Sequence, residues 1–440
     1  MNIQKAVIVS DDLTGATNSG SYFCEDGNAV CVVIDSKYLE QDLYHDYFKK
    51  FPVLAVSTNT RGSTLIKAQK KLSSLGKTIR KLSINLILKK IDTAFRGNIF
   101  IELESLLKSV NINLCFIINA IPSLKRITVG GYQIIDGNLI EDSYYAEDPQ
   151  SKILTSFIPD ILGKNLNTDI SLITINNIRK GMLNIRRLVD EIYNNFKAKI
   201  IVFDSVSKSD IYNILISLKG YKEKAIFCGS LGLVESIREV FFRDYIFNKK
   251  NIKSFNNYFN KKEQFIVGFC GSNYDINLLQ LRKAEKVKQI ELVEVDVEKM
   301  LDKNFNINFA EVKDFVQNIQ RILKRKNIFF IKKVRKDFNT KNLEKKIIGI
   351  LDTIARELFI NSKFLPRRLV LIGGETSFAV LTVLNTKTLL ITERIEQAVD
   401  FGIISDGELT GVEIAIKGGS IGNADTIINM ISYKSKNRKS

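Results

Sequence analysis

The 440-residue sequence is poor in the residues that many catalytic and metal sites require. It contains one histidine, His45, in the unremarkable segment D-L-Y-H-D-Y, and no tryptophan. Its five cysteines are scattered without a C-x-x-C pair, which argues against a disulfide framework and against a zinc site. Mechanisms that need a histidine base or several histidine ligands therefore have no support, and acid–base chemistry falls to carboxylates.

Long apolar runs are also missing. No stretch of about 18 apolar residues occurs, and the first nine residues lack both a basic segment and a long apolar segment. We therefore expect a soluble, cytoplasmic protein without a membrane partner.

The net charge of +17 raises the question of a nucleic-acid partner. The lysines, however, are spread over the whole chain, and neither an arginine-rich arm nor an aromatic RNA-binding motif occurs. No nucleic acid is expected, and the basic tail at residues 434–440 is interpreted as a solvated terminus. The positive charge also suits anionic small ligands, which it attracts by long-range steering.

The chain does have strand-like apolar runs that alternate with helix-like segments. This rhythm and the length predict an α/β protein of two domains, each a mostly parallel sheet flanked by helices. We place an N-terminal domain at 1–245, an Asn- and Lys-rich linker at 246–264 and a C-terminal domain at 265–433. The predicted strands are residues 6–9, 29–34, 53–56, 86–91, 114–118, 199–203, 225–227, 265–269, 369–372 and 412–416, and the predicted helices include 63–75, 99–110, 378–384 and 425–431.

The most informative stretch is K-A-V-I-V-S-D-D-L-T-G-A-T-N-S-G at residues 5–20. A short apolar strand ends in Asp11 and Asp12, and Thr14 is predicted to cap the helix that follows. In an open α/β sheet such a turn lies at the carboxyl end of a strand, where ligands bind. The alternative is an ordinary strand-to-helix turn in which an aspartate caps the helix.

Two further predicted strands end in polar side chains of complementary type. One is followed by Arg61, and the other runs into K-K-I-D-T-A-F-R-G-N with Asp92 and Arg96. Parallel strands would bring these residues and Asp12 to one edge of the sheet. Guanidiniums clamp carboxylates, and aspartates accept hydrogen bonds from hydroxyls, so the set predicts a site for a small polyhydroxy acid. For each arginine, the alternative is a surface ion pair.

A hairpin is predicted at Asp136-Gly137, which lies between two apolar pairs. Lys125 and Arg126 lie in the loop before it. Such a hairpin either covers the crevice or is a plain surface ribbon, and the sequence leaves both interpretations open.

The C-terminal half contains three turns that follow predicted strands. They are Cys270-Gly271-Ser272-Asn273, Gly373-Gly374-Glu375-Thr376 and Lys417-Gly418-Gly419-Ser420. Glycines before a helix allow backbone N–H groups to close around phosphate oxygens, and Lys417 is expected to neutralise phosphate charge. None of the turns is a Walker A or G-x-G-x-x-G motif, so the prediction of a nucleotide site depends on their combination.

Four of these stretches carry a resemblance to a known family. They are S-D-D-L-T-G-A, K-K-I-D-T-A-F-R-G-N, G-G-E-T-S and K-G-G-S-I-G-N, and G-S-L-G-L at residues 229–233 adds to them. Together they resemble the four-carbon acid sugar kinases. The resemblance spans nearly the whole chain. It implies that the N-terminal domain binds an acid such as threonate, erythronate or 3-oxo-tetronate, and that the C-terminal domain binds ATP. The implied substrate contacts are Asp12, Arg61, Asp92, Thr93, Ala94, Phe95 and Arg96, and the implied ATP contacts are Ser272, Gly373, Gly374, Glu375, Thr376, Lys417, Gly418 and Gly419.

The chain departs from the family pattern in several motifs. Thr93 and Ala94 stand where the family usually has Ser and Thr, and Glu375 stands where it has Asp. K-G-G-S-I-G replaces K-S-G-G-F-G, and the loop that ends at Arg126 lacks the usual glycine. These departures bear on the substrate and on ATP affinity more than on the class of reaction.

From these observations we predict an ATP-dependent kinase that phosphorylates a hydroxyl of a small sugar acid in carbohydrate catabolism, with ATP and Mg²⁺ as cofactors. Arg61 and Arg96 are expected to hold the substrate carboxylate, and Asp12 or Asp92 to act as the catalytic group that orients the hydroxyl and accepts its proton. The metal ligands remain unassigned, with Glu375 and Asp425 as candidates.

Two alternatives stay open. The chain is either a basic nucleic-acid-binding protein without catalysis, or a sugar-acid-binding regulatory protein without turnover. The sequence does not identify the acid or the hydroxyl, and it leaves open whether the chain forms a homodimer.

Overall fold

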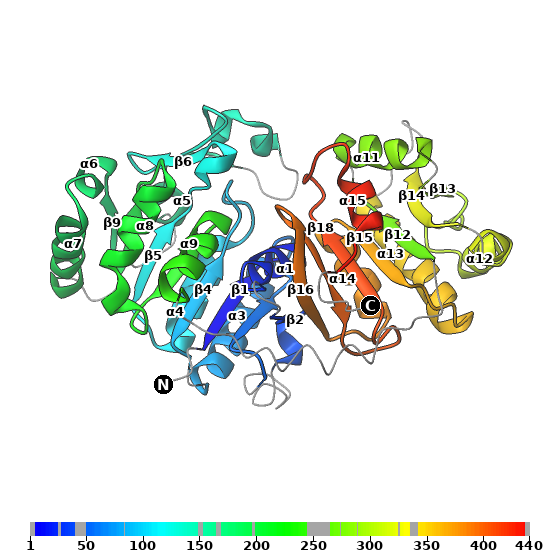
Figure 1. Cartoon of the computed structure of the whole chain (residues 1–440), viewed down its shortest axis with the longest axis horizontal. Coiled ribbons are helices and arrows are strands. Elements are labelled where there is room, and N and C mark those ends of the chain that lie inside the picture. Colours follow the sequence, from blue (N-terminus) through cyan, green and yellow to red (C-terminus); the bar gives the residue numbers. More distant parts are fainter. Residues whose placement is uncertain are drawn as a thin grey trace. The chain divides into compact units, whose positions relative to one another are not determined.

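The computed structural model describes residues 5–24, 28–39, 50–82, 84–147, 153–163, 169–195, 199–243, 265–272, 274–287, 289–323, 326–334 and 342–435. The chain divides into two compact units, which we treat separately (Figure 1). Unit 1 consists of Met1–Phe23 and Asp35–Phe247, and unit 2 of Cys24–Ile34 and Asn248–Ser440. The predicted linker at 246–264 lies outside the described residues, and so does most of the basic tail.

Unit 1 is built on a sheet in which every described pair of neighbouring strands is parallel. Its residues are almost all buried, as expected when helices cover both faces of a parallel sheet. All its strands except the edge strand β9 were predicted from the sequence. In spatial order they are β3 (Val53–Ser57), β1 (Ala6–Ser10), β4 (Leu86–Lys90), β11 (Ile226–Gly229), β5 (Leu114–Ile118), β10 (Lys199–Phe203) and β9 (Asp169–Ile173).

The helices of unit 1 connect these strands and cover the sheet (Figure 1). Four of the buried residues of α3 are spaced three or four apart, as on one face of a helix. They are Ala68, Leu72, Leu75 and Ile79. The helix begins at Leu65, later than predicted, because the Thr64 side chain caps it. The helices are α1 (Leu13–Ser21), α3 (Leu65–Arg80), α4 (Ile99–Val110), α5 (Ile158–Gly163), α6 (Ile175–Ile178), α7 (Met182–Asn195), α8 (Lys208–Ser217) and α9 (Leu231–Phe241), with short 3₁₀ turns η2 (Ser36–Tyr38), η3 (Pro122–Leu124), η4 (Ile140–Asp142), η5 (Tyr144–Glu147) and η6 (Lys219–Tyr221).

A small antiparallel sheet follows β5 and consists of β6 (Arg126–Val129), β7 (Tyr132–Ile135) and β8 (Asn138–Leu139). The predicted hairpin at Asp136-Gly137 is confirmed, and both residues have the positive φ angles (52° and 87°) that a tight hairpin turn requires. A second turn at Gly130-Gly131 was not predicted. Its two N–H groups donate to the buried Asp204 carboxylate over 2.7 and 2.8 Å, which anchors the small sheet.

Unit 2 contains a mixed sheet. Its strands in spatial order are β13 (Glu291–Asp296), β14 (Ile328–Lys333), β12 (Ile266–Cys270), β15 (Arg368–Ile372), β18 (Glu413–Lys417), β17 (Val399–Ile404), β16 (Thr388–Glu396) and β2 (Val30–Val33). The first five are parallel, and the last three join by antiparallel pairing. The helical segments are α11 (Asp275–Lys286), α12 (Phe309–Leu323), α13 (Leu343–Ala355), the π-helix η8 (Arg356–Asn361), α14 (Gly374–Val383) and α15 (Thr426–Ser432). The predicted α/β class with a mostly parallel sheet in each half is confirmed.

The strand predicted at 29–34 belongs to unit 2 rather than to unit 1. It is β2, which pairs antiparallel with β16 in unit 2, so that Val33 lies opposite Thr388. All four residues of β2 are apolar and buried. Such a strand suits either sheet, and its pattern alone does not tell which one it joins.

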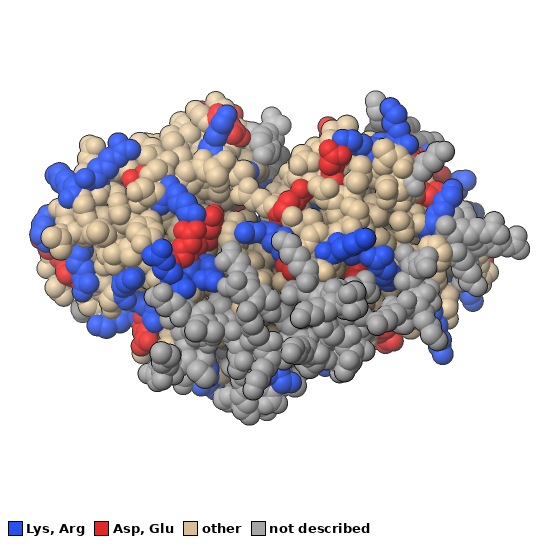
Figure 2. All heavy atoms as spheres, in the orientation of Figure 1, with Lys and Arg blue, Asp and Glu red and all other residues tan. Residues whose placement is uncertain are grey.

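Among the described residues on the face drawn in Figure 2, Lys and Arg side chains lie interspersed with acidic and uncharged residues. In the part of the chain that the structure describes, no helix has the length and apolar character needed to cross a membrane. All five cysteines are buried.

Candidate functional site

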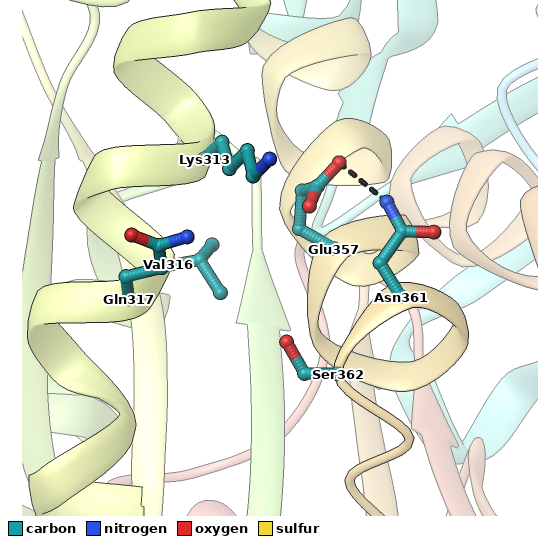
Figure 3. A pocket seen from close by; sticks show the side chains of 6 residues that line it. All are labelled: Lys313, Val316, Gln317, Glu357, Asn361 and Ser362. Atoms are coloured by element: carbon teal, nitrogen blue, oxygen red, sulfur yellow. Dashed lines mark hydrogen bonds between the residues drawn. The ribbon is translucent and has the colours of Figure 1, made fainter.

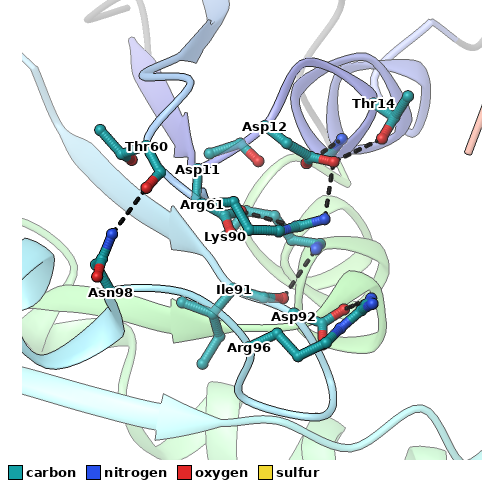
Figure 4. Close-up of polar contacts among 12 residues, drawn as sticks. Asp11, Asp12, Thr14, Thr60, Arg61, Lys90, Ile91, Asp92, Arg96 and Asn98 are labelled. Carbon is teal, nitrogen blue, oxygen red and sulfur yellow. Dashed lines mark hydrogen bonds and ion pairs between the residues drawn. The ribbon is translucent and has the colours of Figure 1, made fainter. Parts of the chain in front are cut away.

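The turn after β1 carries the first group of site residues (Figure 4). Asp12 is the N-cap of α1, which corrects the prediction that Thr14 caps this helix. Asp12 Oδ1 accepts from the backbone N–H of Gly15 over 2.8 Å, and Oδ2 accepts from the Thr14 hydroxyl over 2.7 Å. A Cβ atom at Gly15 would lie 2.3 Å from Ser10 Oγ and 2.5 Å from Asp12 Oδ1, so only glycine fits here.

Arg61, after β3, reaches this turn and is bound by two aspartates. Its Nε and Nη2 donate to the Asp11 carboxylate over 2.7 and 3.0 Å, and its Nη1 donates to Asp12 Oδ2 over 2.9 Å. Asp11 is only 2% exposed. Burial alone would raise the pKa of Asp11, but the charges of Arg61 and the nearby Lys89 hold it below its ordinary value. The cation of Arg61 is therefore already balanced by carboxylates of the protein.

The loop after β4 carries Asp92 and Arg96. Arg96 donates from Nε and Nη2 to the two oxygens of Asp92 over 2.9 and 3.0 Å, and the backbone N–H of Ala94 adds a contact of 3.1 Å. Burial would raise the pKa of Asp92, but Arg96, and then Arg61, lower it. Phe95 has a positive φ of 56°, which a bulky residue rarely adopts, so the loop is held in a strained turn.

A buried ion pair lies beneath the site. Lys89 Nζ is 2.7 Å from Glu102 Oε2, and both side chains are fully buried. The other oxygen of Glu102 accepts from the Thr60 hydroxyl over 2.5 Å, which fixes the residue directly before Arg61. Lys90, also buried, donates to the Ile91 carbonyl over 2.8 Å, and burial lowers its pKa. The lysines add positive charge below the aspartates.

Arg126 and Tyr145 close one side of the Asp92 loop. Arg126 Nη1 donates to the Thr93 hydroxyl, and Nη2 donates to the Tyr145 hydroxyl over 2.9 Å. The guanidiniums of Arg96 and Arg126 also face the Tyr145 ring, at 4.9 and 5.7 Å from its centroid. The sequence analysis noted Arg126 without assigning it a role, and it missed Tyr145, which no motif marks.

The structure thus brings most predicted substrate residues together. Arg61 and Arg96 were expected to hold a substrate carboxylate, and the structure pairs each with aspartates of the protein, Arg61 with Asp11 and Asp12 and Arg96 with Asp92. The side chains of Ala94 and Phe95 are buried, so these residues shape the loop through their backbone. Further site residues that the sequence did not single out are Lys90, Glu102 and Asn119, whereas Asn98 belongs to the K-K-I-D-T-A-F-R-G-N motif. Asn98 and Asn119 donate to backbone carbonyls of the two site loops.

In unit 2 the three predicted turns meet. A Cβ atom at Gly419 would lie 2.5 Å from Ser272 Oγ, and one at Gly373 would lie 3.6 Å from Ser272 Cβ. Gly373 has a φ of 98° and precedes α14, which begins at Gly374. Thr376, in the first turn of α14, is buried beside Gly271. The turns therefore surround the N-terminus of a ten-residue helix, where backbone N–H groups favour anions.

Lys417 does not point to a ligand. It is fully buried, and its ammonium donates to Asn277 Oδ1 (2.7 Å), the Ile421 carbonyl (2.9 Å) and the Gly418 carbonyl (3.1 Å). These contacts use all three N–H donors of a lysine. The predicted role of Lys417 in neutralising phosphate does not fit this placement, because the side chain instead fixes the turn at 418–421.

The two acidic candidates for metal binding lie in different surroundings. Glu375 is exposed in the first turn of α14, whereas Asp425 pairs with Lys283 over 2.7 Å. Among the residues that the structure describes, no group of three or more His, Cys, Asp or Glu side chains is placed to hold a metal ion.

A separate pocket of about 580 Å³ lies between α12 and η8 in unit 2 (Figure 3). It contains none of the predicted site residues. Within it, Asn361 donates to Glu357 over 2.7 Å. The lining residues are Lys313, Val316, Gln317, Glu357, Asn361 and Ser362.

Each half of the chain matches a known family model. Residues 6–237 match the family model of a sugar-binding N-terminal domain, and residues 267–427 match that of a nucleotide-binding C-terminal domain. The chain belongs to the four-carbon acid sugar kinase family, as its motifs predicted.

Two curated relatives align over nearly their full length. A D-erythronate kinase of Heliobacterium modesticaldum is 22% identical over 446 residues, covering 98% of this chain and 97% of the relative. A D-threonate kinase of Salmonella typhimurium is 20% identical over 445 residues, covering 98% of each chain.

Solved structures share the fold. A Salmonella typhimurium LT2 protein superposes with a TM-score of 0.76 at 16% identity, over 97% of this chain and 98% of its own. A Haemophilus influenzae protein does so with a TM-score of 0.68 at 16% identity, over 96% and 98%.

Proposed function

We propose that this protein is an ATP-dependent kinase that phosphorylates a hydroxyl of a four-carbon sugar acid of the threonate, erythronate or 3-oxo-tetronate type. The observation that carries the proposal is the cluster of aspartates and guanidiniums at the carboxyl ends of β1, β3 and β4. Ligands of open α/β sheets bind at such an edge. Family membership and the names of the two curated relatives support the same reaction.

Asp12 is the better candidate for orienting the attacking hydroxyl. An ionised carboxylate offers about four acceptor positions, and Asp12 uses three of them, for Gly15, Thr14 and Arg61. A substrate hydroxyl would take the fourth. Asp92 is less suited to accept a proton, because Arg96 holds its pKa below the ordinary value.

The positive groups would stabilise the charge that phosphoryl transfer develops. Lys89 and Lys90 lie beneath the aspartates, and Arg61 and Arg96 lie beside them. In phosphoryl transfer the protein mainly positions the reactants and stabilises charge, so this reaction requires no histidine.

The turns of unit 2 would bind the nucleotide. The backbone N–H groups of the first turn of α14, from Gly374 onward, would donate hydrogen bonds to phosphate oxygens, with Ser272 and Gly419 alongside. Mg²⁺ would arrive with the ATP phosphates, as it commonly does in kinases, and would neutralise their charge. Glu375, exposed in the first turn of α14, is the candidate protein ligand.

The test is ADP release with MgATP over a panel of D- and L-threonate, D- and L-erythronate, their oxo derivatives and glycerate. One strongly preferred acid would establish the reaction and name the substrate. No ADP with any member, from protein that still binds ATP, would contradict the proposal as stated.

The matched variant is Asp12→Asn, and the control is Asp160→Asn, at an exposed residue of α5. Asparagine is as good an N-cap as aspartate, so we expect an intact fold with phosphorylation abolished in the first variant and unchanged in the second. Near-normal turnover of Asp12→Asn would remove Asp12 from the mechanism.

A further inference from the structure

The three guanidiniums of the unit 1 site differ in how their charge is balanced. Arg61 is paired with Asp11 and Asp12, and Arg96 is paired with Asp92. Arg126 contacts only neutral oxygens, the hydroxyls of Thr93 and Tyr145. Within the described residues it has no carboxylate partner, so it contributes an uncompensated cation.

Arg126 is also held in one position. It begins β6, is half-buried, and is tied by its two terminal nitrogens to side chains from two different segments. The Tyr145 ring supports the guanidinium from its face. A guanidinium has five N–H donors, and Arg126 uses two of them in contacts with the described residues, so three remain for a ligand as far as those residues are concerned.

We propose that Arg126 binds the carboxylate of the substrate, and that it decides the preference for an acid over a neutral sugar. The inference rests on the proposed function and replaces the clamp by Arg61 and Arg96 that the sequence suggested. A carboxylate on Arg126 gains charge-assisted hydrogen bonds without first displacing a carboxylate of the protein. On Arg61 or Arg96 it would have to compete with a bidentate aspartate.

Thr93 helps to place Arg126. The Thr93 hydroxyl accepts from Arg126, so this hydrogen bond ties the guanidinium to the Asp92 loop. Arg126 is therefore a specificity-determining residue, and Thr93 and Tyr145 position it.

The experiment compares wild type with Arg126→Gln. The control is Lys125→Gln, because Lys125 directly precedes Arg126 and its side chain is exposed. Each is assayed by ADP release with D-threonate and D-erythronate and with the primary amides of both acids, which keep the shape and lose the charge. For Arg126→Gln we expect kcat/KM for the preferred acid to fall by about 10- to 100-fold, as for the loss of a charged hydrogen bond. The value for the amide should change by less than about threefold. Lys125→Gln should behave as wild type.

Three outcomes would overturn the inference. Equal losses for acid and amide would make Arg126 a structural tie between two loops. An unchanged kcat/KM for the acid would mean that it does not touch the carboxylate. A wild type that phosphorylates no acid of the panel would refute the proposed function itself, and the inference with it.

A second variant covers a failure of Arg126→Gln to fold. Arg126→Lys keeps the charge and loses the planar fork, so it should retain a preference for the acid over the amide while losing part of the affinity. Calorimetric titration with ATP should give the wild-type affinity for both variants, which separates a local effect from general damage.

Discussion

The buried pair of Lys89 and Glu102 gives the sharpest test of what holds the site in place. Both side chains are 0% exposed, and their charged atoms are 2.7 Å apart. Burial lowers the pKa of Lys89, but the carboxylates of Glu102 and then Asp11 raise it above its ordinary value, so the lysine stays charged in the core. Glu102→Gln removes the compensating charge and leaves the ammonium buried without it.

The cost follows from this burial. Removing one partner of a buried ion pair destabilises a protein by about 3–5 kcal/mol, whereas an exposed helix pair is worth about 0.3–0.5 kcal/mol. The chain provides the matched control on the same helix, because Glu104 in α4 pairs with Lys108, which is 75% exposed. At about 2–4 °C per kcal/mol for a unit of this size, we expect Glu102→Gln to lower the midpoint of thermal unfolding by roughly 6–20 °C, and Glu104→Gln by less than about 2 °C.

The assay is thermal and urea unfolding followed by circular dichroism at pH 7, with Lys89→Met and the double variant alongside. Replacing both partners leaves no uncompensated charge, so the double variant should be more stable than the sum of the single losses predicts, by about 2–3 kcal/mol. Additive losses, or a Glu102→Gln variant no weaker than Glu104→Gln, would refute the claim that a charged pair supports the site.

Two further predictions concern unit 2. Gly419→Val would place atoms within about 3 Å of Ser272 and Tyr274, so ATP affinity in a calorimetric titration should fall more than tenfold while sugar-acid affinity is kept; equal losses of both would contradict the assignment of ATP to this unit. Burial lowers the pKa of Lys417 from 10.5 to about 8. Between these two values the unfolded chain binds a proton that the folded protein does not hold, so the free energy of unfolding rises with pH. This contribution is greatest above pH 10.5 and is lost as the pH falls through 8. The stability of wild type minus that of Lys417→Met should therefore rise by about 3 kcal/mol between pH 8 and 10.5 in urea unfolding, and a flat or falling difference would contradict the burial of a charged lysine.

The sequence predicted where the site lies because parallel strands end at the same edge of a sheet. Asp12, Arg61 and Asp92 each follow a strand of one parallel sheet, and their convergence needed only the recognition of those strands. It did not predict what each charged group binds. Whether Arg61 contacts a ligand or Asp11 depends on side-chain geometry that a motif does not contain.

The same limit explains the remaining errors. Lys417 follows a strand next to two glycines, as a phosphate-binding lysine does, but the partners that turn it inward are far away in sequence, such as Asn277. The pairing of β16 with β2 is equally non-local. Patterns along a chain show that a residue is apolar or charged, whereas the choice among distant partners depends on packing in three dimensions.

The membership of β2 in unit 2 has a consequence for how the protein is made. Cys24, just before β2, donates its thiol hydrogen to the carbonyl of Ile391, a residue 367 positions further along the chain. At about 5–20 residues per second, the ribosome delivers that partner roughly 20 to 70 seconds after β2 has been synthesised. Throughout this interval Val30–Val33, four apolar residues that are buried in the finished protein, lack their antiparallel partner β16. One edge of the strand therefore stays unpaired until most of the chain has been synthesised, and early contact with a chaperone would protect that edge from aggregation.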